Sequence, residues 1–408
     1  MNGRAGKGEV EAVVASEWTV EHQQWIKSLA VDAGFDLCGV ASLDTEDERV
    51  TAERFSAWVE AGRAGEMEYL KRRNEAGVLI RSAAQVAFPW ARSVVVCAMN
   101  YNVGGPLSIE PADPGTGWIG RYAWSGRRAG GEAAAGEEQT AGVAAGLKST
   151  DYHEELLERL QTMEIALQQR MGCETRCYVD TGPLVERSVA ARAGIGWIGK
   201  NTCVLNQELG SWLLLAVIVT SLPVAEGFDI AGAADRCGSC TRCIDACPTA
   251  ALVGDREMDA SRCIAYLTIE KKGVIAEELR EPMGRQVFGC DICQDVCPWN
   301  RRSPIVVREG SLARAELINP SLEWLAGMDG AEFNRWFRGS PLERTRRKRL
   351  LRNVAIAMGN SGEPRFLPQL KEWMQGDDEV LAETAAWAAG WIEERSAGTA
   401  HGTPVSTC

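Results

Sequence analysis

The alternation of apolar and polar positions divides the first half of the chain into strands and helices. The run from Arg92 to Met99 is rich in β-branched residues and predicts a strand, while apolar residues at helical spacing over 154–170 predict a helix. A short strand over 176–180 precedes a predicted helix that opens near Pro183 and runs to about Ala193. The continuous apolar run over 212–222 predicts a fully buried strand. Strands that alternate with helices in this way indicate a mixed α/β unit.

The chain is 408 residues long, which predicts two or three domains. We expect a mixed α/β domain over 18–225, a cysteine-rich domain over 226–305 and a helical region over 306–395, with flexible termini at 1–17 and 396–408. In the helical region, apolar residues recur at helical spacing in three short segments joined by glycine and proline turns, which is typical of helical repeats. The expected fold class is therefore α+β, with a separate cysteine-rich unit and a C-terminal α-helical region.

A stretch of low complexity interrupts the first domain. Residues 125–150 hold six glycines and seven alanines and lack aromatic residues. A stretch of this composition cannot bury enough apolar surface to fold by itself. We therefore expect a flexible insertion rather than an element of the fold.

Cysteine is abundant and histidine is rare, which narrows the possible metal chemistry. Eight of the 14 cysteines lie between Cys237 and Cys297, and the only imidazoles are those of His22, His153 and His401. A zinc site of several histidines or a haem held by two is therefore excluded, so any metal must be bound through sulfur. The N-terminus lacks an apolar signal, and no apolar run is long enough to span a membrane. We accordingly expect a cytoplasmic protein with reduced thiols and no membrane partner.

Residues 237–248 carry the cysteine spacing of bacterial two-cluster ferredoxins. Cys237, Cys240, Cys243 and Cys247 are separated by two, two and three residues, and a proline follows the last of them. The first three thiolates can surround one iron–sulfur cube while the fourth reaches a neighbouring cluster. The motif therefore predicts a second set of ligands elsewhere in the chain.

The second set is one cysteine short in the local sequence. Cys290, Cys293 and Cys297 repeat the end of the motif, and the isolated Cys263 can complete the set. If the two sets exchange their fourth ligands, two [4Fe-4S] clusters result. Their ligands are then Cys237, Cys240, Cys243 and Cys297 for the first cluster, and Cys247, Cys263, Cys290 and Cys293 for the second. A pair of structural zinc sites is the alternative, because paired cysteines also bind zinc.

Two segments before the cysteine block are candidates for the reaction itself. Gly194, Gly196 and Gly199 match the letters of a dinucleotide-binding loop, but they follow a predicted helix rather than a strand. We expect them to form a tight loop or to approach a large cofactor other than NAD. Asp180 ends a short apolar strand, where a carboxyl group with little solvent around it can stay protonated and act as a general acid. Its alternative role is to cap the following helix.

One segment is basic although the formal net charge of the chain is −12, which by itself argues against nucleic acid as a partner. Between Arg301 and Arg352, twelve basic side chains stand against six acidic ones. The densest run, named here the basic run, consists of Arg346, Arg347, Lys348 and Arg349. Such a run is either a solvated helix face or a surface that binds phosphate groups.

Five further stretches, spread over most of the chain, form a specific series. They are Cys177-Tyr-Val-Asp-Thr-Gly-Pro-Leu-Val-Glu-Arg187, Ala193-Gly-Ile-Gly-Trp-Ile-Gly-Lys-Asn-Thr202, Gly210-Ser-Trp212, Cys263-Ile-Ala-Tyr-Leu-Thr-Ile-Glu270 and Phe288-Gly-Cys-Asp-Ile-Cys-Gln-Asp-Val-Cys-Pro-Trp-Asn300. Together with the ferredoxin spacing, this series resembles the epoxyqueuosine reductase family over about residues 18–394.

The resemblance implies a cobalamin-dependent enzyme that reduces epoxyqueuosine, at the wobble position of tRNA anticodons, to queuosine. It implies a first domain that holds base-off cobalamin, a ferredoxin-like domain whose two clusters relay electrons from an external low-potential donor, and a HEAT-like helical region. Matched by position, the proton donor beside the cofactor falls on Asp180 and a cobalamin contact on Arg81. Loops near the corrin fall on Asn201, Thr202 and Ser211. We also expect a monomer whose basic run binds tRNA.

The chain departs from the family at the low-complexity stretch, which separates Trp124 from Asp151-Tyr-His153. These residues would rejoin at the base of the insertion, so we expect the insertion to lie outside the active site. We expect His153 to form a hydrogen bond rather than to bind cobalt. Two other functions stay open, namely a reductive dehalogenase-like cobalamin enzyme and a ferredoxin-type electron-carrier subunit. Neither accounts for both the Asp180 segment and the basic run.

Overall fold

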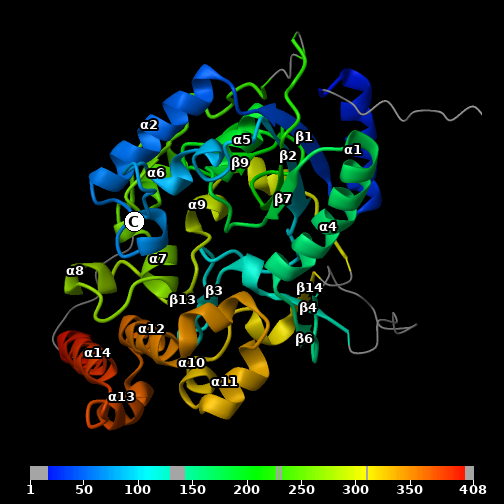
Figure 1. Cartoon of the computed structure of the whole chain (residues 1–408). Coiled ribbons are helices and arrows are strands. Elements are labelled where there is room, and N and C mark those ends of the chain that lie inside the picture. The colour runs from blue at the N-terminus through cyan, green and yellow to red at the C-terminus, as the bar shows by residue number, and fades with distance from the viewer. Residues whose placement is uncertain (1–16, 129–142, 227, 229–231, 309–310, 400–408) are drawn as a thin grey trace, which may run out of the picture.

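The structure is a computed structural model that describes residues 17–128, 143–226, 228, 232–308 and 311–399 (Figure 1). Its first half is built on a four-stranded antiparallel sheet with the strand order β1-β2-β10-β7. The strands are β1 (Leu37–Ser42), β2 (Ser93–Asn100), β7 (Thr175–Tyr178) and β10 (Leu213–Thr220). The strands predicted over 92–99, 176–180 and 212–222 are therefore confirmed, with small shifts at their ends.

Helices cover both faces of this sheet. Along β2, Val95 and Cys97 face α1 (Val20–Asp32) and α4 (Tyr152–Met171), whereas Val94 and Val96 face α5 (Glu186–Arg192). This alternation explains why β2 and most of β10 are apolar at consecutive positions, since a strand covered on both faces has no solvent side. Helix α2 (Glu46–Glu60) extends from the same unit over the cysteine-rich part of the chain (Figure 1).

The helix expected near Pro183 starts later than predicted. Helix α5 begins at Glu186, its N-cap is Val185, and no side chain caps it. The interpretation of Asp180 as a helix cap is therefore wrong. Pro183 instead belongs to the turn that links β7 to α5, so Asp180 and its neighbours form a loop of several residues between the two elements.

The cysteine-rich part consists of short elements. These are α6 (Arg242–Asp245), β11 (Leu252–Gly254), β12 (Glu257–Met258), α7 (Ile264–Ile269), α8 (Glu277–Arg280), β13 (Gln286–Phe288) and α9 (Ile292–Asp295). Helices α6 and α9 pack against each other, and both carry a cysteine of the block. Between them in sequence, α7 packs on β13, which pairs in parallel with the short β3 (Trp118–Ile119) of the first half.

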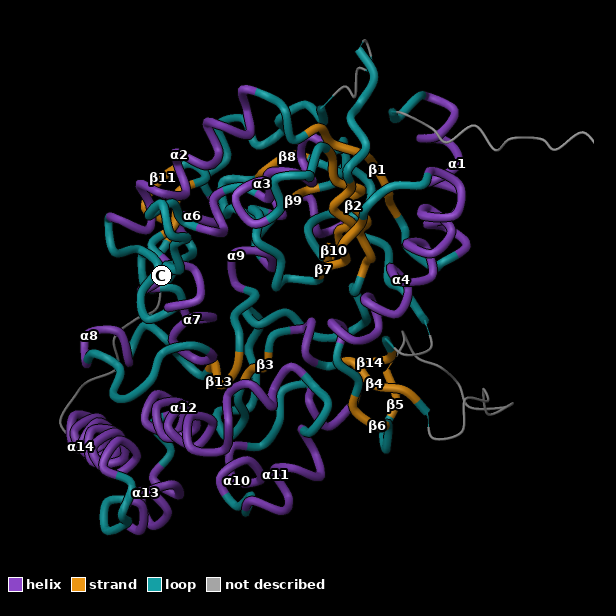
Figure 2. Tube along the Cα trace, in the orientation of Figure 1, coloured by secondary structure: helices purple, strands orange, loops and turns teal. Residues whose placement is uncertain are grey.

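The C-terminal region is helical, as predicted. It contains α10 (Leu322–Ala326), α11 (Gly330–Phe337), α12 (Arg346–Ser361), α13 (Leu367–Trp373) and α14 (Glu379–Thr399), and α14 packs against α12 and α13 (Figure 2). Helix α14 continues to Thr399, so residues 396–399 of the expected flexible terminus are helical, while 1–16 and 400–408 lie outside the described residues. No described helix is both long and apolar enough to cross a membrane.

The helical region shares its core with the rest of the chain. One cluster of buried side chains joins Val103 and Trp124 of the first half, Phe288 of the cysteine-rich part, and α12 with α14. Within α12, Arg352 and Asn353 are 1% and 0% exposed. The Arg352 guanidinium donates to the carbonyl groups of Leu267, Lys271 and Gly273, and the Asn353 amide donates to those of Thr268 and Val287. Buried donors and acceptors thus satisfy each other across the boundary near residue 305.

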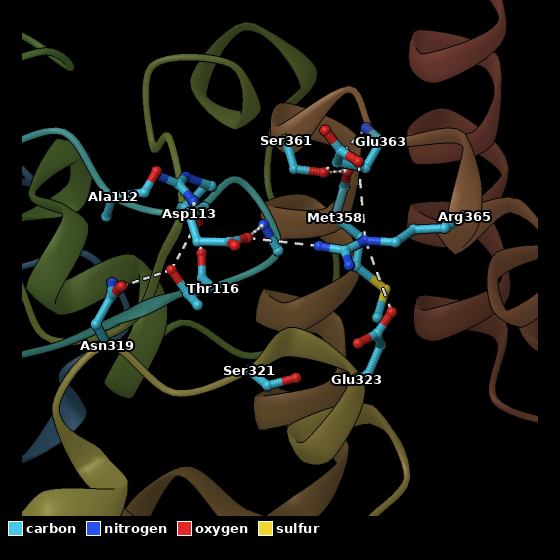
Figure 3. Close-up of polar contacts among 12 residues, drawn as sticks. Ala112, Asp113, Thr116, Asn319, Ser321, Glu323, Met358, Ser361, Glu363 and Arg365 are labelled. Atoms are coloured by element: carbon cyan, nitrogen blue, oxygen red, sulfur yellow. Dashed lines mark hydrogen bonds and ion pairs between the residues drawn. The ribbon is translucent and has the colours of Figure 1, made fainter.

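A second set of polar contacts fixes a loop of the first half to the helical region (Figure 3). The Thr116 hydroxyl donates to Asn319 Oδ1 over 2.6 Å, and Arg365 Nη2 lies 3.5 Å from Asp113 Oδ1. Arg365 also lies 3.7 Å from the Glu323 carboxylate. These ion pairs are exposed, so we expect each to add little stability, but together they hold the loop in one position.

The ends of the low-complexity stretch are part of the fold, which corrects the prediction for 125–150. Strands β4 (Ser125–Arg127), β5 (Val143–Ala144), β6 (Lys148–Ser149) and β14 (Leu312–Arg314) form a small sheet with the order β5-β14-β4-β6. These strands are two or three residues long, too short for a periodic pattern. Residues 129–142 lie outside the described part of the chain.

Candidate active site and cluster ligands

The eight cysteines of the block lie in two groups of four. In the first group, the Cys297 thiol is an electrostatic neighbour of Cys237, Cys240 and Cys243. In the second group, Cys290 lies beside Cys247 and Cys263, and Cys293 lies beside Cys263 and Cys290. The groups have the same members as the two ligand sets that the spacing predicts. That they bind iron is part of the proposal below.

The chemistry of these thiols suits a set of metal ligands. Burial raises the pKa of Cys243 to about 11, so at neutral pH this thiol keeps its proton unless a cation replaces it. Within the described ranges, no three His, Cys, Asp or Glu side chains converge closely enough to hold a single metal ion. A four-iron cluster has no such requirement, because each thiolate binds a different iron atom.

Asp180 follows β7 in a conformation that is unusual for a residue with a side chain. Its φ is 58°, in the left-handed region that aspartate and asparagine tolerate best after glycine. The Arg81 Nη2 group donates to the Asp180 carbonyl over 2.6 Å, and the Glu186 carboxylate lies near the Asp180 main chain. Arg81, expected at the cobalamin, therefore lies where it fixes the loop that carries Asp180.

The Asp180 carboxyl group is exposed to solvent and ionised, which corrects the expectation of a solvent-shielded, protonated group. Its side chain is 59% exposed. The Oδ2 atom lies 3.7 Å from His153 Nε2 and 3.7 Å from Arg344 Nη1. The close approach of His153 is the main reason that the pKa of Asp180 lies below its ordinary value, and the charges of Arg344 and Arg81 add to this effect. Asp180 is therefore a carboxylate at neutral pH in this arrangement.

His153 lies between two carboxylates at the start of α4. Its Nδ1 is 2.6 Å from Asp151 Oδ1, and Asp151 also caps the helix by accepting the His153 N–H at 3.0 Å. Burial alone would lower the pKa of His153, but the hydrogen bond to Asp151 and the nearby Asp180 carboxylate outweigh it and raise the pKa. Arg344 Nη2 lies 3.1 Å from Nε2, so both ring nitrogens have partners. The expected hydrogen-bonding role of His153 is confirmed.

Aromatic side chains surround this polar group. The Tyr152 ring stacks on the His153 ring with centroids 3.9 Å apart, and Tyr122 meets Tyr152 edge-on at 5.9 Å. Tyr69 is 42% exposed, and the Arg81 guanidinium lies 5.5 Å from its ring centroid. None of these tyrosines could be singled out from the sequence, because the contacts join segments far apart in the chain.

The other predicted cofactor residues lie together at the junction with the cysteine block. Asn201 and Ser211 are each 4% exposed. The Asn201 amide donates to the Cys293 carbonyl over 3.4 Å, and the Ser211 hydroxyl donates to Gln294 Oε1 over 3.0 Å. Thr202 has a φ of 66° and accepts a hydrogen bond from Arg187 at 3.0 Å.

A cavity of about 150 Å³ opens at this junction. Its lining consists of Tyr101, Arg187, Cys203, Val204, Ser211, Leu213, Leu215 and Gln294. Cys203, expected to be an ordinary buried residue, is hydrogen-bonded to Cys293 of the second thiol group. A cavity lined by both polar and apolar side chains therefore lies directly beside the second thiol group.

The basic run is divided between the surface and the interior. Arg346 and Lys348 are exposed, and Lys348 pairs with Asp378 at 3.2 Å. Arg347 donates to the Met328 carbonyl over 2.6 Å and Arg349 to the Thr345 carbonyl over 2.7 Å, so both are half-buried and partly used within the fold.

Comparisons with known proteins agree with this arrangement. Residues 236–300 match the family model of a 4Fe-4S double cluster binding domain, and residues 81–181 match the model described as epoxyqueuosine reductase QueG, DUF1730. The epoxyqueuosine reductase of Xanthomonas campestris pv. campestris is 35% identical over 381 residues, which cover 93% of this chain and 98% of the relative. The chain belongs to the epoxyqueuosine reductase family.

Other members of this family support the same assignment. The epoxyqueuosine reductase of Escherichia coli K12 is 32% identical, covering 92% of this chain and 90% of the relative. A crystal structure of epoxyqueuosine reductase with an epoxyqueuosine-modified tRNA-Tyr stem loop superposes with a TM-score of 0.75 at 29% identity, covering 94% of this chain and 95% of that one. A Bacillus subtilis epoxyqueuosine reductase with its catalytic loop swung out of the active site superposes with a TM-score of 0.74 at 28% identity, with the same coverage.

Proposed function

We propose that this protein reduces epoxyqueuosine in tRNA to queuosine. The observation that carries the proposal is the match, over nearly the whole length of both chains, to epoxyqueuosine reductases, one of them bound to an epoxyqueuosine-modified stem loop. The polar group around Asp180 and the two groups of thiols supply the acid–base and electron-transfer components that such a reduction needs. The substrate implies a cytoplasmic protein, and we propose that it acts as a monomer.

Two [4Fe-4S] clusters and one cobalamin complete the proposed enzyme. The cysteine groups would hold the clusters in the exchanged arrangement, with an external low-potential donor as the electron source. The corrin would lie against the cavity beside Cys293, which Arg187 and Ser211 line, with Asn201 and Thr202 close by. Bound cobalamin, in its base-off form, supplies a strongly reducing metal centre. Both His153 nitrogens already have partners, so this residue is not available to bind cobalt.

The assay that tests the function combines the reconstituted protein with cobalamin, a low-potential reductant and tRNA carrying epoxyqueuosine, under anaerobic conditions. The expected product is queuosine, detected by mass spectrometry of the digested tRNA. The matched control omits only cobalamin and is expected to give no product. An unchanged epoxyqueuosine signal with iron- and cobalamin-loaded protein would contradict the proposal.

We further propose that the exposed members of the basic run, Arg346 and Lys348, bind tRNA phosphates. The double variant R346E/K348E should weaken tRNA binding by about tenfold or more at physiological salt. The slope of log K against log salt concentration should become shallower by about one for each phosphate that is no longer bound. The measurement is a binding titration at several salt concentrations.

The matched control for this prediction is K27E/R49E. It makes the same change in net charge at two exposed side chains on α1 and α2, away from the basic run. Equal affinity in both double variants would mean that the basic run is only a solvated helix face.

A further inference from the structure

The proposed reaction has a proton requirement that one carboxylate cannot meet. Reducing an epoxide to an alkene and water consumes two electrons and two protons: C₂O ring + 2 e⁻ + 2 H⁺ gives C=C + H₂O. The electrons come from a one-electron donor of low potential, used twice through the clusters. Both protons must reach the same oxygen, and Asp180 can carry only one at a time.

Asp180 is also poorly suited to store that proton between turnovers. Its carboxyl group is largely exposed and lies within 3.7 Å of both His153 and Arg344. Positive neighbours stabilise the charged form of a carboxylate. The substrate-free site therefore keeps Asp180 ionised, and the proton must reside on a group that can pass it to Oδ2.

The imidazole of His153 is placed to be that group. It bridges Asp151 at 2.6 Å on one side and Asp180 at 3.7 Å on the other, and its side chain is only 15% exposed. When the ring is neutral, Nδ1–H donates to Asp151 and Nε2 accepts from Arg344. When the ring is protonated, Nε2–H donates to Asp180, and Arg344 can turn to the same carboxylate, from which its Nη1 is already 3.7 Å. In the structure Arg344 is the hydrogen-bond partner of Nε2 and Asp180 Oδ2 lies 3.7 Å from the same nitrogen, so either group is placed to be its partner.

We propose that His153 is a positioning residue that acts through Asp180. It stores a proton and transfers it to Asp180, and it does so again between the two protonations of the leaving oxygen. This inference rests on the proposed function. In each cycle the N–H bond at His153 Nε2 breaks and an O–H bond forms at Asp180 Oδ2. Asp180 then gives this proton to the substrate oxygen, and the neutral ring takes up another from solvent. Two passages deliver the two protons, and the second releases the oxygen as water.

The charged and titratable groups around the ring favour this role. Asp151 at the start of α4, Asp180 after β7 and Arg344 from the turn Pro341–Thr345 face it directly. A protonated ring has the Asp151 carboxylate on one side and the Asp180 carboxylate on the other, and both stabilise its charge, whereas the charge of Arg344 opposes it. The hydrogen bond to Asp151 and the proximity of Asp180 accordingly raise the pKa of His153.

Other nearby groups are less suited to store the proton. Burial is the main reason that the pKa values of Tyr122 and Tyr152 lie well above the ordinary value, so neither phenol releases its proton near neutral pH. Burial also raises the pKa of Glu186 to about 8, but its carboxyl lies near the Asp180 main chain and forms no described hydrogen bond with the Asp180 carboxyl. Arg81 likewise bonds to the Asp180 carbonyl.

The test compares H153Q with the wild type in the anaerobic assay, with tRNA saturating and both cluster and cobalamin contents measured. The turnover number should fall by about 100-fold, the lower end of the range for proton-transfer groups, because solvent can partly reload Asp180. In the wild type, kcat should decline as pH rises through the raised pKa of His153, since only the protonated ring can give a proton. This decline should be absent in H153Q. The matched control H22Q changes a histidine on α1 and should behave as the wild type.

A second variant separates proton storage from a structural role. In D151N the negative charge that helps to raise the pKa of His153 is lost, although the amide oxygen can still accept from Nδ1. The decline of kcat should therefore move to lower pH while the ring remains. Added imidazole should restore part of the activity of H153A. If H153Q retains the wild-type turnover and pH profile, or if D151N leaves the decline in place, the inference is wrong. If the wild type itself makes no queuosine, the proposed function fails instead.

Discussion

Replacing Asp180 with asparagine is expected to lower the rate of epoxyqueuosine reduction by about 10³-fold, with tRNA affinity and iron content unchanged. Asp180 is the exposed member of the polar group, and its carboxylate lies 3.7 Å from both His153 and Arg344. Asparagine has the same shape but cannot release a proton to the leaving oxygen. It also tolerates the left-handed backbone at this position, which alanine does not.

The measurement is the single-turnover rate of queuosine formation at saturating enzyme, together with a tRNA-binding titration. D44N is the matched control, because it makes the same replacement at an exposed aspartate that bonds to Gln85 outside the site. Full turnover in D180N, with cofactors retained, would refute the role of Asp180 as the acid.

Removing one ligand of the second thiol group should abolish turnover altogether. In C263A, we expect the iron content to fall from about eight to about four atoms per chain, because the second cluster loses the only ligand that lies outside the two motifs. The second group lies beside the cavity proposed for cobalamin, through Cys293 and Cys203. Losing this cluster would therefore remove the last step of the electron path.

Iron analysis and electron paramagnetic resonance of the reduced protein check this prediction. C173A is the control, since Cys173 lies in the first half of the chain and belongs to neither thiol group. Eight iron atoms per chain in C263A would overturn the ligand assignment. Stoichiometric zinc in place of iron in the wild type would overturn the cluster interpretation itself.

The parts of this protein that could be predicted from its sequence are those determined by neighbouring residues. Cysteine spacing depends on how a short turn wraps around a cluster, so the two thiol groups follow from local sequence. The buried strand β10 and helices α12 and α14 follow from continuous or periodic apolar positions. The series of motifs around Asp180 was specific enough to indicate the family.

The state of Asp180 could not be predicted in this way. Its ionisation depends on His153, from the start of α4, and on Arg344, from a turn in the helical region. The local sequence does not reveal how close His153 and Arg344 lie to Asp180, so the apolar strand before Asp180 wrongly predicts a protonated carboxyl group. Strands β4, β5 and β6 were missed for a similar reason, because each exists only through pairing with a strand from elsewhere in the sequence: β4 and β5 pair with β14, and β6 pairs with β4. Cys203 likewise gains its partner Cys293 only in the folded chain.

The buried bonds of Arg352 and Asn353 also bear on how this enzyme can be divided or redesigned. Helix α12 begins with the residues proposed to meet RNA, and one turn later it satisfies main-chain groups of α7, the helix that starts after Cys263. A fragment ending near residue 305 would leave these carbonyl groups without donors and uncover the shared core. The cysteine-rich part therefore cannot be moved to another protein as an independent unit. Exchanging the helices proposed to face RNA between relatives would also require exchanging the surface around α7 on which they pack.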